Sequence, residues 1–224
     1  MILKTEGVTL GYIKYRDSSI IARVFTREFG FQSFLVTGIR SKKAKNNPGF
    51  FEGFTILDLV LYQSKRSTLH RLSEFKLSEP CHSIRTEVRK RAIALFLSEV
   101  LYRLLQAEEE QHVPLYTFLR QSILQFDGAS AAIENFHLQF LLRLASYLGF
   151  GFESISSHSQ IALGHSEEID HLASDLLQAD YFSPFDMTGK QRSEILEAMI
   201  KYYQTHLHQG LEVKSLAVLQ SIFK

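Results

Sequence analysis

The sequence predicts an α+β protein in which a small β-domain precedes an all-helical domain. Up to residue 80, short stretches rich in Ile, Val and Phe alternate with turn signals about every ten residues, a pattern typical of strands. Beyond Pro80, apolar residues recur at helical spacing. The 224 residues suffice for two domains with separate cores. We therefore expect a strand domain over residues 1–80 and a helical domain over residues 81–224.

Five strands are expected in the first domain. Gly7 and Gly11 lie in the first of them, at positions where a strand can bend or bulge. The longest connection, residues 40–53, contains the dense turn signal Asn46-Asn47-Pro48-Gly49. Short strands at this spacing are typical of a small barrel or sandwich. The predicted strands cover residues 2–14, 19–26, 31–39, 54–62 and 68–77.

The second domain is expected to consist of amphipathic helices. The first carries a wide apolar stripe from Ile84 to Leu105. The second has Pro114 at its start, where proline is favoured. Residues 152–166, rich in Ser, His and Gly, are predicted to form a loop inserted between helices. The predicted helices cover residues 84–105, 113–126, 129–148, a segment that starts near Ser166, 190–208 and 214–222.

Charge is distributed unevenly between the two predicted domains. Residues 1–80 carry 13 Lys and Arg against 7 Asp and Glu, a net charge of +6. Residues 81–224 carry 12 against 17, a net charge of −5, which leaves the whole chain at +1. Such an asymmetry indicates that the two halves have different partners, and a basic half favours an anionic one.

The strand over residues 19–27 is the most informative segment for function. Alternation places its apolar residues on one face and Arg23, Phe25 and Arg27 on the other. A surface that mixes guanidinium groups with an aromatic ring can neutralise phosphates and stack bases, as sequence-tolerant single-strand binders do. Phe31 and Phe34 are further candidates for stacking. An ordinary exposed strand, or one covered by the helical half, fits the same pattern.

Cations also gather in the predicted loops of the first domain. Arg40, Lys42, Lys43 and Lys45 lie within six consecutive residues, and such close like charges favour an anionic counterpart. If four to six cations contacted single-stranded phosphates, the log–log slope of affinity against salt would be roughly −3 to −4. A solvated loop or the wet side of a helix is the alternative. Further candidates in other loops and on the first helix are Arg16, Lys65, Arg66, Arg85, Arg89 and Arg91.

No pattern in the chain predicts a catalytic or metal site. The single Cys81 excludes a Cys-rich zinc site and an internal disulfide. His158, His165 and His171 are spaced unlike common metal ligands. Zinc-hydrolase, phosphate-loop and nucleophile-elbow motifs are missing, so we expect a protein that is not an enzyme and needs no cofactor. Without a secretory signal or a membrane-spanning apolar run, we expect a cytoplasmic location.

Three stretches of the first domain form a recognisable set. They are Gly11-Tyr12 leading to Arg16-Asp17-Ser18-Ser19, the turn Val24-Phe25-Thr26-Arg27-Glu28-Phe29-Gly30, and the basic segment Val36-Thr37-Gly38-Ile39-Arg40-Ser41-Lys42-Lys43. Together with the strand from Leu57 to Tyr62 and the apolar segments 92–105 and 141–149, they resemble the RecO family of bacterial recombination mediators. The likeness is strongest over residues 10–62.

This resemblance implies a five-stranded oligonucleotide-binding (OB-fold) barrel followed by an all-helical domain. It also implies a non-enzymatic, nucleoid-associated protein of DNA repair and recombination that binds single- and double-stranded DNA, anneals strands and loads the recombinase. Two protein partners are implied as well: RecR and the acidic C-terminal tail of single-stranded DNA-binding protein, the latter docking on the helical half. By position, the implied DNA contacts are Arg16, Arg23, Arg27, Arg40, Lys42, Lys43 and Lys45.

The sequence departs from this family at one place. Many RecO proteins carry a four-cysteine zinc module after the helix that ends near residues 148–149. Here the corresponding residues, 152–165, include Ser and His but no Cys. Because tetrahedral zinc sites need closely spaced thiolate or imidazole ligands, we predict that this chain binds no zinc.

Two other functions remain open on the residues alone. The first is a protein-interaction adaptor whose barrel binds proteins rather than DNA. Reversing the charges of Lys42, Lys43 and Lys45 together would leave the partners of such an adaptor in place. The second is a hydrolase built from unrecognised His and Glu residues, which a pocket with converging titratable groups would favour.

Overall fold

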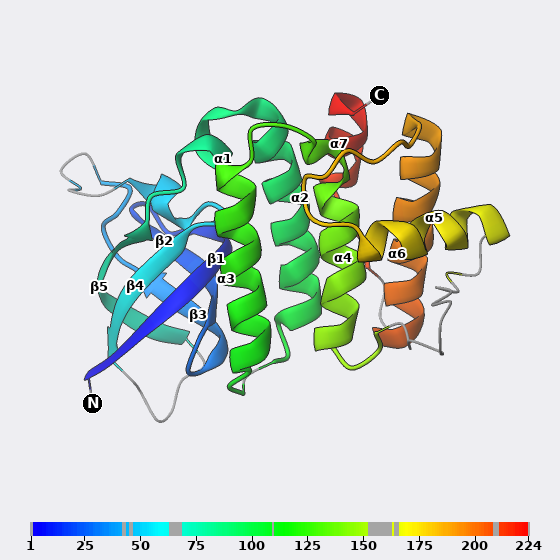
Figure 1. The fold of residues 1–224 in the computed structure, drawn as a ribbon. Coiled ribbons are helices and arrows are strands. Elements are labelled where there is room, and N and C mark those ends of the chain that lie inside the picture. Colours follow the sequence, from blue (N-terminus) through cyan, green and yellow to red (C-terminus); the bar gives the residue numbers. More distant parts are fainter. Residues whose placement is uncertain are drawn as a thin grey trace. The chain divides into compact units, whose positions relative to one another are not determined.

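Five strands form a closed barrel in the N-terminal part of the chain (Figure 1). The computed structural model describes residues 2–41, 44, 47–62, 69–108, 110–151, 163, 166–207 and 211–223. Around the barrel the strand order is β1-β2-β3-β5-β4. The strands are β1 (Ile2–Tyr15), β2 (Ser19–Thr26), β3 (Gly30–Val36), β4 (Ile56–Tyr62) and β5 (Leu69–Glu79). The predicted fold class, a five-stranded barrel followed by helices, is confirmed.

Alternation along the strands fills the interior of the barrel. Ile20, Ala22 and Val24 of β2 are fully buried in the barrel core, as predicted, beside Phe34 of β3 and Leu57 of β4. The β3 and β5 strands pair in parallel, whereas the other neighbouring strands are antiparallel.

A bulge interrupts β1 where the sequence predicts one. The pairing of β1 with β2 shifts register between Thr9 and Tyr12. Gly11, inside this interval, has φ +109°, a conformation that L side chains rarely adopt and that glycine reaches at low cost. The bulge lets the long strand bend around the closed barrel.

Helices follow the barrel. None of the described helices is both long and apolar enough to cross a bilayer. Two short 3-10 turns, η1 (Pro48–Phe51) and η2 (Ile133–Asn135), precede β4 and α4. The helices are α1 (His82–Thr86), α2 (Val88–Leu105), α3 (Val113–Gly128), α4 (Phe136–Tyr147), α5 (Glu167–Gln178), α6 (Gly189–Leu207) and α7 (Leu216–Ile222).

The helix starts depart from the predictions in two places. The predicted helix over residues 84–105 is two helices, because Glu87 has the extended conformation φ −88°, ψ 121°. The helix predicted from residue 129 begins at Phe136, after Ala132 in the left-handed region (φ 53°) and the turn η2. In contrast, the start predicted near Ser166 is confirmed: its side chain caps α5 by accepting from the N–H of Ile169, at 3.3 Å.

The chain divides into two compact units, Met1–Leu124 and Gln125–Lys224. The first contains the barrel, α1, α2 and most of α3, and the second contains α4 to α7. The predicted change from strands to helices near Pro80 therefore lies inside the first unit. The helices α1 and α2 and most of α3 therefore belong to the same compact unit as the barrel.

A polar network joins α3 to the barrel within the first unit. The carboxylate of Glu6 on β1 accepts hydrogen bonds from the Tyr116 hydroxyl at 2.9 Å, from Arg120 Nε at 3.1 Å and from Ser78 of β5. The same guanidinium donates through Nη2 to Glu79 at 2.8 Å. One carboxylate and one guanidinium thus fasten two strands to one helix.

The network sets the ionisation of its members. Burial raises the pKa of Glu6, but hydrogen bonds from Ser78 and Tyr116 and the charge and hydrogen bond of Arg120 lower it more, so that it lies below the usual value of 4.5. Burial and the adjacent Glu6 carboxylate raise the pKa of Tyr116 far above its usual range. Glu6 is therefore ionised and Tyr116 protonated at neutral pH.

Replacing Glu6 by Gln should destabilise the protein. The substitution removes the charge that Arg120 and Tyr116 share, and hydrogen bonds to partly buried charged groups are typically worth about 1–3 kcal/mol. We expect the free energy of unfolding in urea to fall by about that amount. Glu74→Gln, which removes an exposed carboxylate from β5, is the matched control and should change it by no more than about 0.5 kcal/mol.

The contribution of Glu6 should depend on pH. Since its folded pKa is lowered, the stabilisation is fully present above the unfolded value and is lost as the pH falls through the folded pKa. The stability difference between wild type and Glu6→Gln should be constant from neutral pH down to mildly acidic pH. It should then shrink below pH 4.5. A difference that grows on acidification would contradict the assigned ionisation.

Candidate nucleic-acid interface

Arg16 and Arg40 meet at one end of the barrel. Arg16 follows β1 directly, and Arg40 lies in the connection after β3. Arg40 Nη1 donates to the carbonyl oxygen of Arg16 at 3.1 Å, and the Arg40 N–H donates to the carbonyl oxygen of Ser18 at 2.9 Å. The exposed Arg16 side chain lies over the Tyr15 ring, with its guanidinium carbon 5.2 Å from the ring centroid. The Arg40 guanidinium is thus held against the Arg16 backbone, and the Arg16 side chain lies beside the Tyr15 ring.

Backbone conformation brings these two loops together. Arg16 has φ +50°, in the left-handed region that costs a non-glycine residue roughly 1–2 kcal/mol, so its neighbours must hold it there. Gly38 has φ +73° and turns the chain sharply after β3. The N–H of Ser41 closes that turn by donating to the Gly38 carbonyl at 3.1 Å. Arg40, inside the turn, is thereby directed at the β1–β2 loop.

The outer face of β2 is not the exposed arginine and aromatic surface that alternation predicts. Phe25 is 0% exposed, so the prediction that its ring stacks on bases is wrong. Arg23 lies over the ring of Tyr102 on α2, with 3.8 Å from guanidinium carbon to centroid. Phe31 packs against the same tyrosine at 5.9 Å, and Phe34 is fully buried in the barrel core. A helix of the first unit covers this face, the alternative that the sequence left open.

The turn between β2 and β3 has a structural role. Thr26 Oγ1 donates to the Gly30 carbonyl at 2.9 Å and accepts from the Phe29 N–H at 3.1 Å. Gly30 has φ +61°, and a Cβ there would lie 2.3 Å from the backbone oxygens of Glu108 and Glu110. The Phe31 N–H donates to the Glu108 oxygen at 2.7 Å. This turn is therefore shaped to receive the segment that follows α2.

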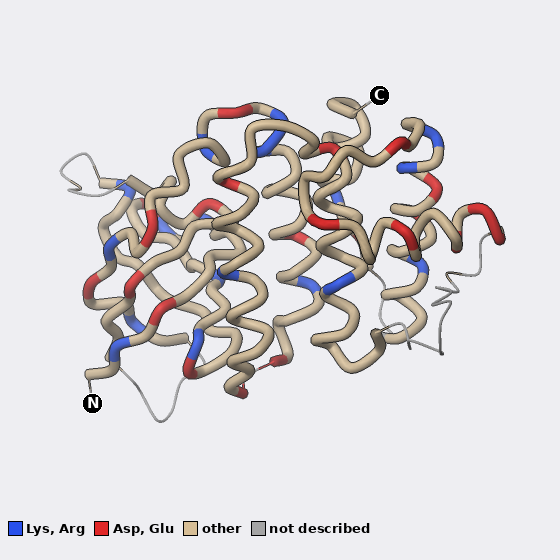
Figure 2. Tube along the Cα trace, viewed as in Figure 1, with Lys and Arg blue, Asp and Glu red and all other residues tan. Residues whose placement is uncertain are grey.

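The predicted cations of the first domain do not share one surface. Arg27 is exposed but lies past the far end of β2, close to Glu28 at 3.9 Å. From Ser19 to Thr26 the strand rises about 23 Å, which separates Arg27 from the Arg16 and Arg40 pair. Figure 2 shows basic and acidic segments interleaved around the barrel. The expectation that these cations converge is therefore wrong for Arg23 and Arg27.

Other predicted contacts in the first domain lie outside the described residues. They are Lys42, Lys43, Lys45, Lys65 and Arg66.

The cations at the start of the helical part are divided between two helices. Arg85 on α1 donates to Thr55 Oγ1 at 3.2 Å and lies over the Phe50 ring at 5.5 Å, so it packs on the barrel. Arg89 and Arg91 are exposed on α2, and the break at Glu87 means that Arg85 and Arg89 do not share a helix face. Lys90 between them is 0% exposed and donates to Ser83 at 2.6 Å.

Tyr62 and Arg71 are exposed residues that sequence reasoning missed. They are cross-strand partners on β4 and β5, and Tyr62 is 51% exposed. They flank the segment that contains Lys65 and Arg66, where the sequence points only to charge. One signal in the sequence points to them: in the predicted hairpin, an aromatic residue at the end of β4 faces outward and lies opposite an arginine on β5.

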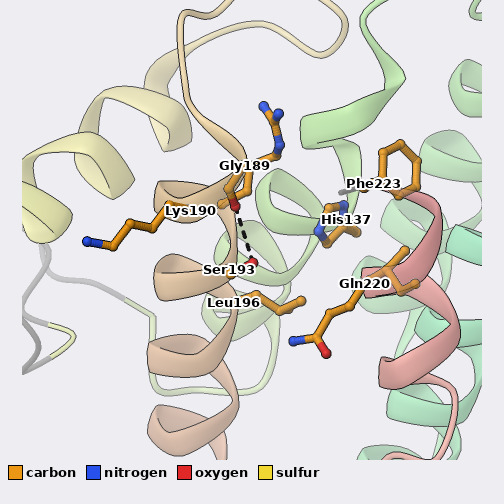
Figure 3. Close-up of a pocket in the computed structure, with 9 residues that line it drawn as sticks. His137, Gly189, Lys190, Ser193, Leu196, Gln220 and Phe223 are labelled. Atoms are coloured by element: carbon orange, nitrogen blue, oxygen red, sulfur yellow. Dashed lines mark hydrogen bonds between the residues drawn. The ribbon is translucent and has the colours of Figure 1, made fainter.

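The second unit contains a separate pocket between α6 and α7, with a volume of about 370 Å³ (Figure 3). Leu196, Leu219 and Phe223 supply apolar walls. Arg192 lines the same pocket, and its buried Nε has no hydrogen-bond partner among the described residues. Burial, followed by the charge of Arg192, lowers the pKa of His137 to about 3. The positive charge near this pocket therefore comes from arginine and not from histidine.

The prediction that the chain binds no zinc remains a prediction. Of residues 152–165, where many relatives carry the zinc module, only Leu163 is described. Within the described ranges, no three His, Cys, Asp or Glu side chains lie together as a metal site would require.

Comparison with known proteins identifies the family. Residues 1–81 match the family model "Recombination protein O N terminal", and residues 85–169 match "Recombination protein O C terminal". Three curated relatives are named "DNA repair protein RecO". They come from Bacteroides fragilis (33% identical), Flavobacterium psychrophilum (31%) and Phocaeicola vulgatus (31%), and each alignment covers all of both chains. The chain therefore belongs to the RecO family.

Proposed function

We propose that this chain is a non-enzymatic DNA-binding mediator of DNA repair and recombination. It binds single- and double-stranded DNA through the phosphates, anneals complementary strands and assists loading of the recombinase. Family membership and the names of its relatives support the repair role. The observation that carries the DNA-binding role is the Arg16 and Arg40 pair, held together at one end of a basic barrel. Lys42, Lys43 and Lys45 follow this pair directly in the sequence.

The mechanism is electrostatic. Cations that neutralise phosphates release counterions, and phosphate contacts carry little sequence information, so binding is largely independent of sequence. Annealing follows when two strands are held with their charge neutralised and their base edges free. Arg23, stacked on Tyr102, drops out of the set of proposed contacts. The further proposed contacts are Arg27, Lys65, Arg66, Arg89 and Arg91.

The pocket between α6 and α7 is the proposed site for the acidic C-terminal tail of single-stranded DNA-binding protein. A tail that ends in Phe offers an apolar ring for Leu196, Leu219 and Phe223, and a carboxylate for the guanidinium of Arg192. In Figure 3 the Lys190 side chain points away from His137 and Phe223, which leaves Arg192 as the proposed cation of this site. RecR is the second proposed partner, and the nucleoid is the proposed location.

Replacing Arg16 by Gln should make DNA binding less sensitive to salt. The substitution removes an exposed charge but keeps the backbone carbonyl that Arg40 contacts. In gel-shift titrations over a range of salt concentrations, the wild-type slope for single strands should be roughly −3 to −4, and the variant slope should be less steep by about 0.7. Lys76→Gln, an exposed cation on β5 paired with Asp58, should keep the wild-type slope. Wild-type binding that is indifferent to salt would defeat the proposal.

Replacing Arg192 by Gln should weaken binding of an acidic peptide that ends in Phe. A hydrogen bond to a charged group is worth about 1.5–3 kcal/mol, so the dissociation constant measured by fluorescence anisotropy should rise about ten- to hundredfold. Lys201→Gln, an exposed cation on the same helix, is the control and should bind the peptide as wild type does. Equal affinity in the Arg192 variant and in wild type would rule this pocket out.

A further inference from the structure

The barrel closes through a short seam that leaves a hollow beside it. The parallel pairing of β3 with β5 covers only Ser33–Leu35 against Leu69–Arg71. Immediately beyond it, Gly38 turns the chain away from β3, and the register of β5 against β4 slips near Ser73. The two strands therefore separate, and a hollow of about 490 Å³ opens between them. Its volume falls within the range of about 300–1,000 Å³ that is common for small-molecule sites.

The hollow has an apolar floor and polar walls. Val36 and Leu72 are buried in the barrel core, and Phe75, half-buried, packs edge-on against Phe51 at a centroid distance of 4.8 Å. The exposed hydroxyl residues Thr37, just after β3, and Ser73, within β5, also line the hollow. Because a rigid barrel core lies beneath it, this floor is preformed.

An exposed ring and a guanidinium lie at its rim. Tyr62 and Arg71 are direct cross-strand partners, so their side chains lie on the same face of the sheet. Both are exposed, and both line the hollow. No salt bridge with a described acidic residue within 4.0 Å holds Arg71. The Arg71 guanidinium and an exposed phenol ring therefore line an open hollow whose walls carry hydroxyl groups.

We propose that this hollow binds one unstacked nucleotide of single-stranded DNA. The base stacks on Tyr62, and its phosphate binds Arg71. Aromatic rings stack on any base, since every base has a π face, while arginine matches the geometry of phosphate oxygens. Hydroxyl groups of the kind that Thr37 and Ser73 carry can donate to or accept from base edges and sugars. The inference rests on the proposed DNA-binding function and adds a subsite to it.

The geometry makes this subsite selective for single strands. A base can reach a ring on the barrel only when it is neither paired nor stacked in a duplex, and extracting a base from a duplex costs a few kcal/mol. The proposed phosphate contacts of Arg16 and Arg40 need no unpaired base and are therefore open to either form of DNA. The hollow thus distinguishes single strands from duplexes, and the paired arginines do not.

The test compares Tyr62→Ala, Tyr62→Phe, Arg71→Gln and the control Lys76→Gln, each checked for an unchanged thermal unfolding midpoint. Affinity is measured by fluorescence anisotropy with a short oligothymidine and with a duplex of equal length. Stacking one base is typically worth about 5- to 150-fold in affinity, so Tyr62→Ala should weaken single-strand binding within that range. Tyr62→Phe keeps the ring and should retain the affinity, and Arg71→Gln should weaken it and reduce the salt slope by about 0.7. Duplex binding should be unchanged throughout.

A stacking signal gives a second readout. The fluorescence of an oligonucleotide that contains 2-aminopurine should change on binding to wild type and to Tyr62→Phe, but not to Tyr62→Ala. If wild type binds single strands and Tyr62→Ala binds them equally well, the subsite is wrong and the proposed function stands. Equal weakening of single-strand and duplex binding would also overturn the subsite. A wild-type protein that binds neither form would overturn the proposed function itself.

Discussion

Closure of the barrel through three residue pairs between β3 and β5 is the constraint on which the rest of the structure depends. The other neighbouring strands are joined by longer antiparallel pairings, and this parallel pairing is the shortest link in the closed ring. Closure also determines where each loop begins, because the pairing register sets the residue at which each strand ends. Arg71 pairs with Leu35 at the end of this register, and Arg40 lies in the connection that follows β3.

The first helices after the barrel, α1, α2 and most of α3, belong to the same compact unit as the barrel. Arg120 fastens α3 to Glu6 and Glu79, and Arg23 stacks on Tyr102 of α2. In both cases a charged group on the barrel contacts a side chain on a helix, through ion pairs for Glu6 and Glu79 and through a cation–π contact for Arg23. Contact with Tyr102 makes the Arg23 guanidinium part of the packing between β2 and α2.

Much of the fold can be predicted from the sequence, and less of the candidate site. Strand limits and inward residues such as Ile20 and Val24 follow from alternation, and the start of α5 follows from its Ser166 cap. Periodicity does not say what covers the outer face of a strand, so it assigned Phe25 and Arg23 to solvent. Periodicity also does not predict a helix break at a single residue. The extended backbone of Glu87 divides one apolar stripe into two helices. The place of Tyr62 beside the hollow cannot be predicted from the sequence, because the hollow forms only where β3 and β5 separate.

The contact between Gly30 and the segment after α2 bears on how this chain can be dissected. A fragment cut where the strands end, at Glu79, would lose Tyr102, Arg120 and the Glu108 carbonyl that receives the Phe31 N–H. Such a piece would present bare aromatic and carboxylate groups to water on the side from which the helices had been removed. The solubility and aggregation of this fragment would then reflect groups that the helices cover in the intact unit, and not the native surface. The smallest faithful unit for biochemical work on the barrel accordingly includes the first helices.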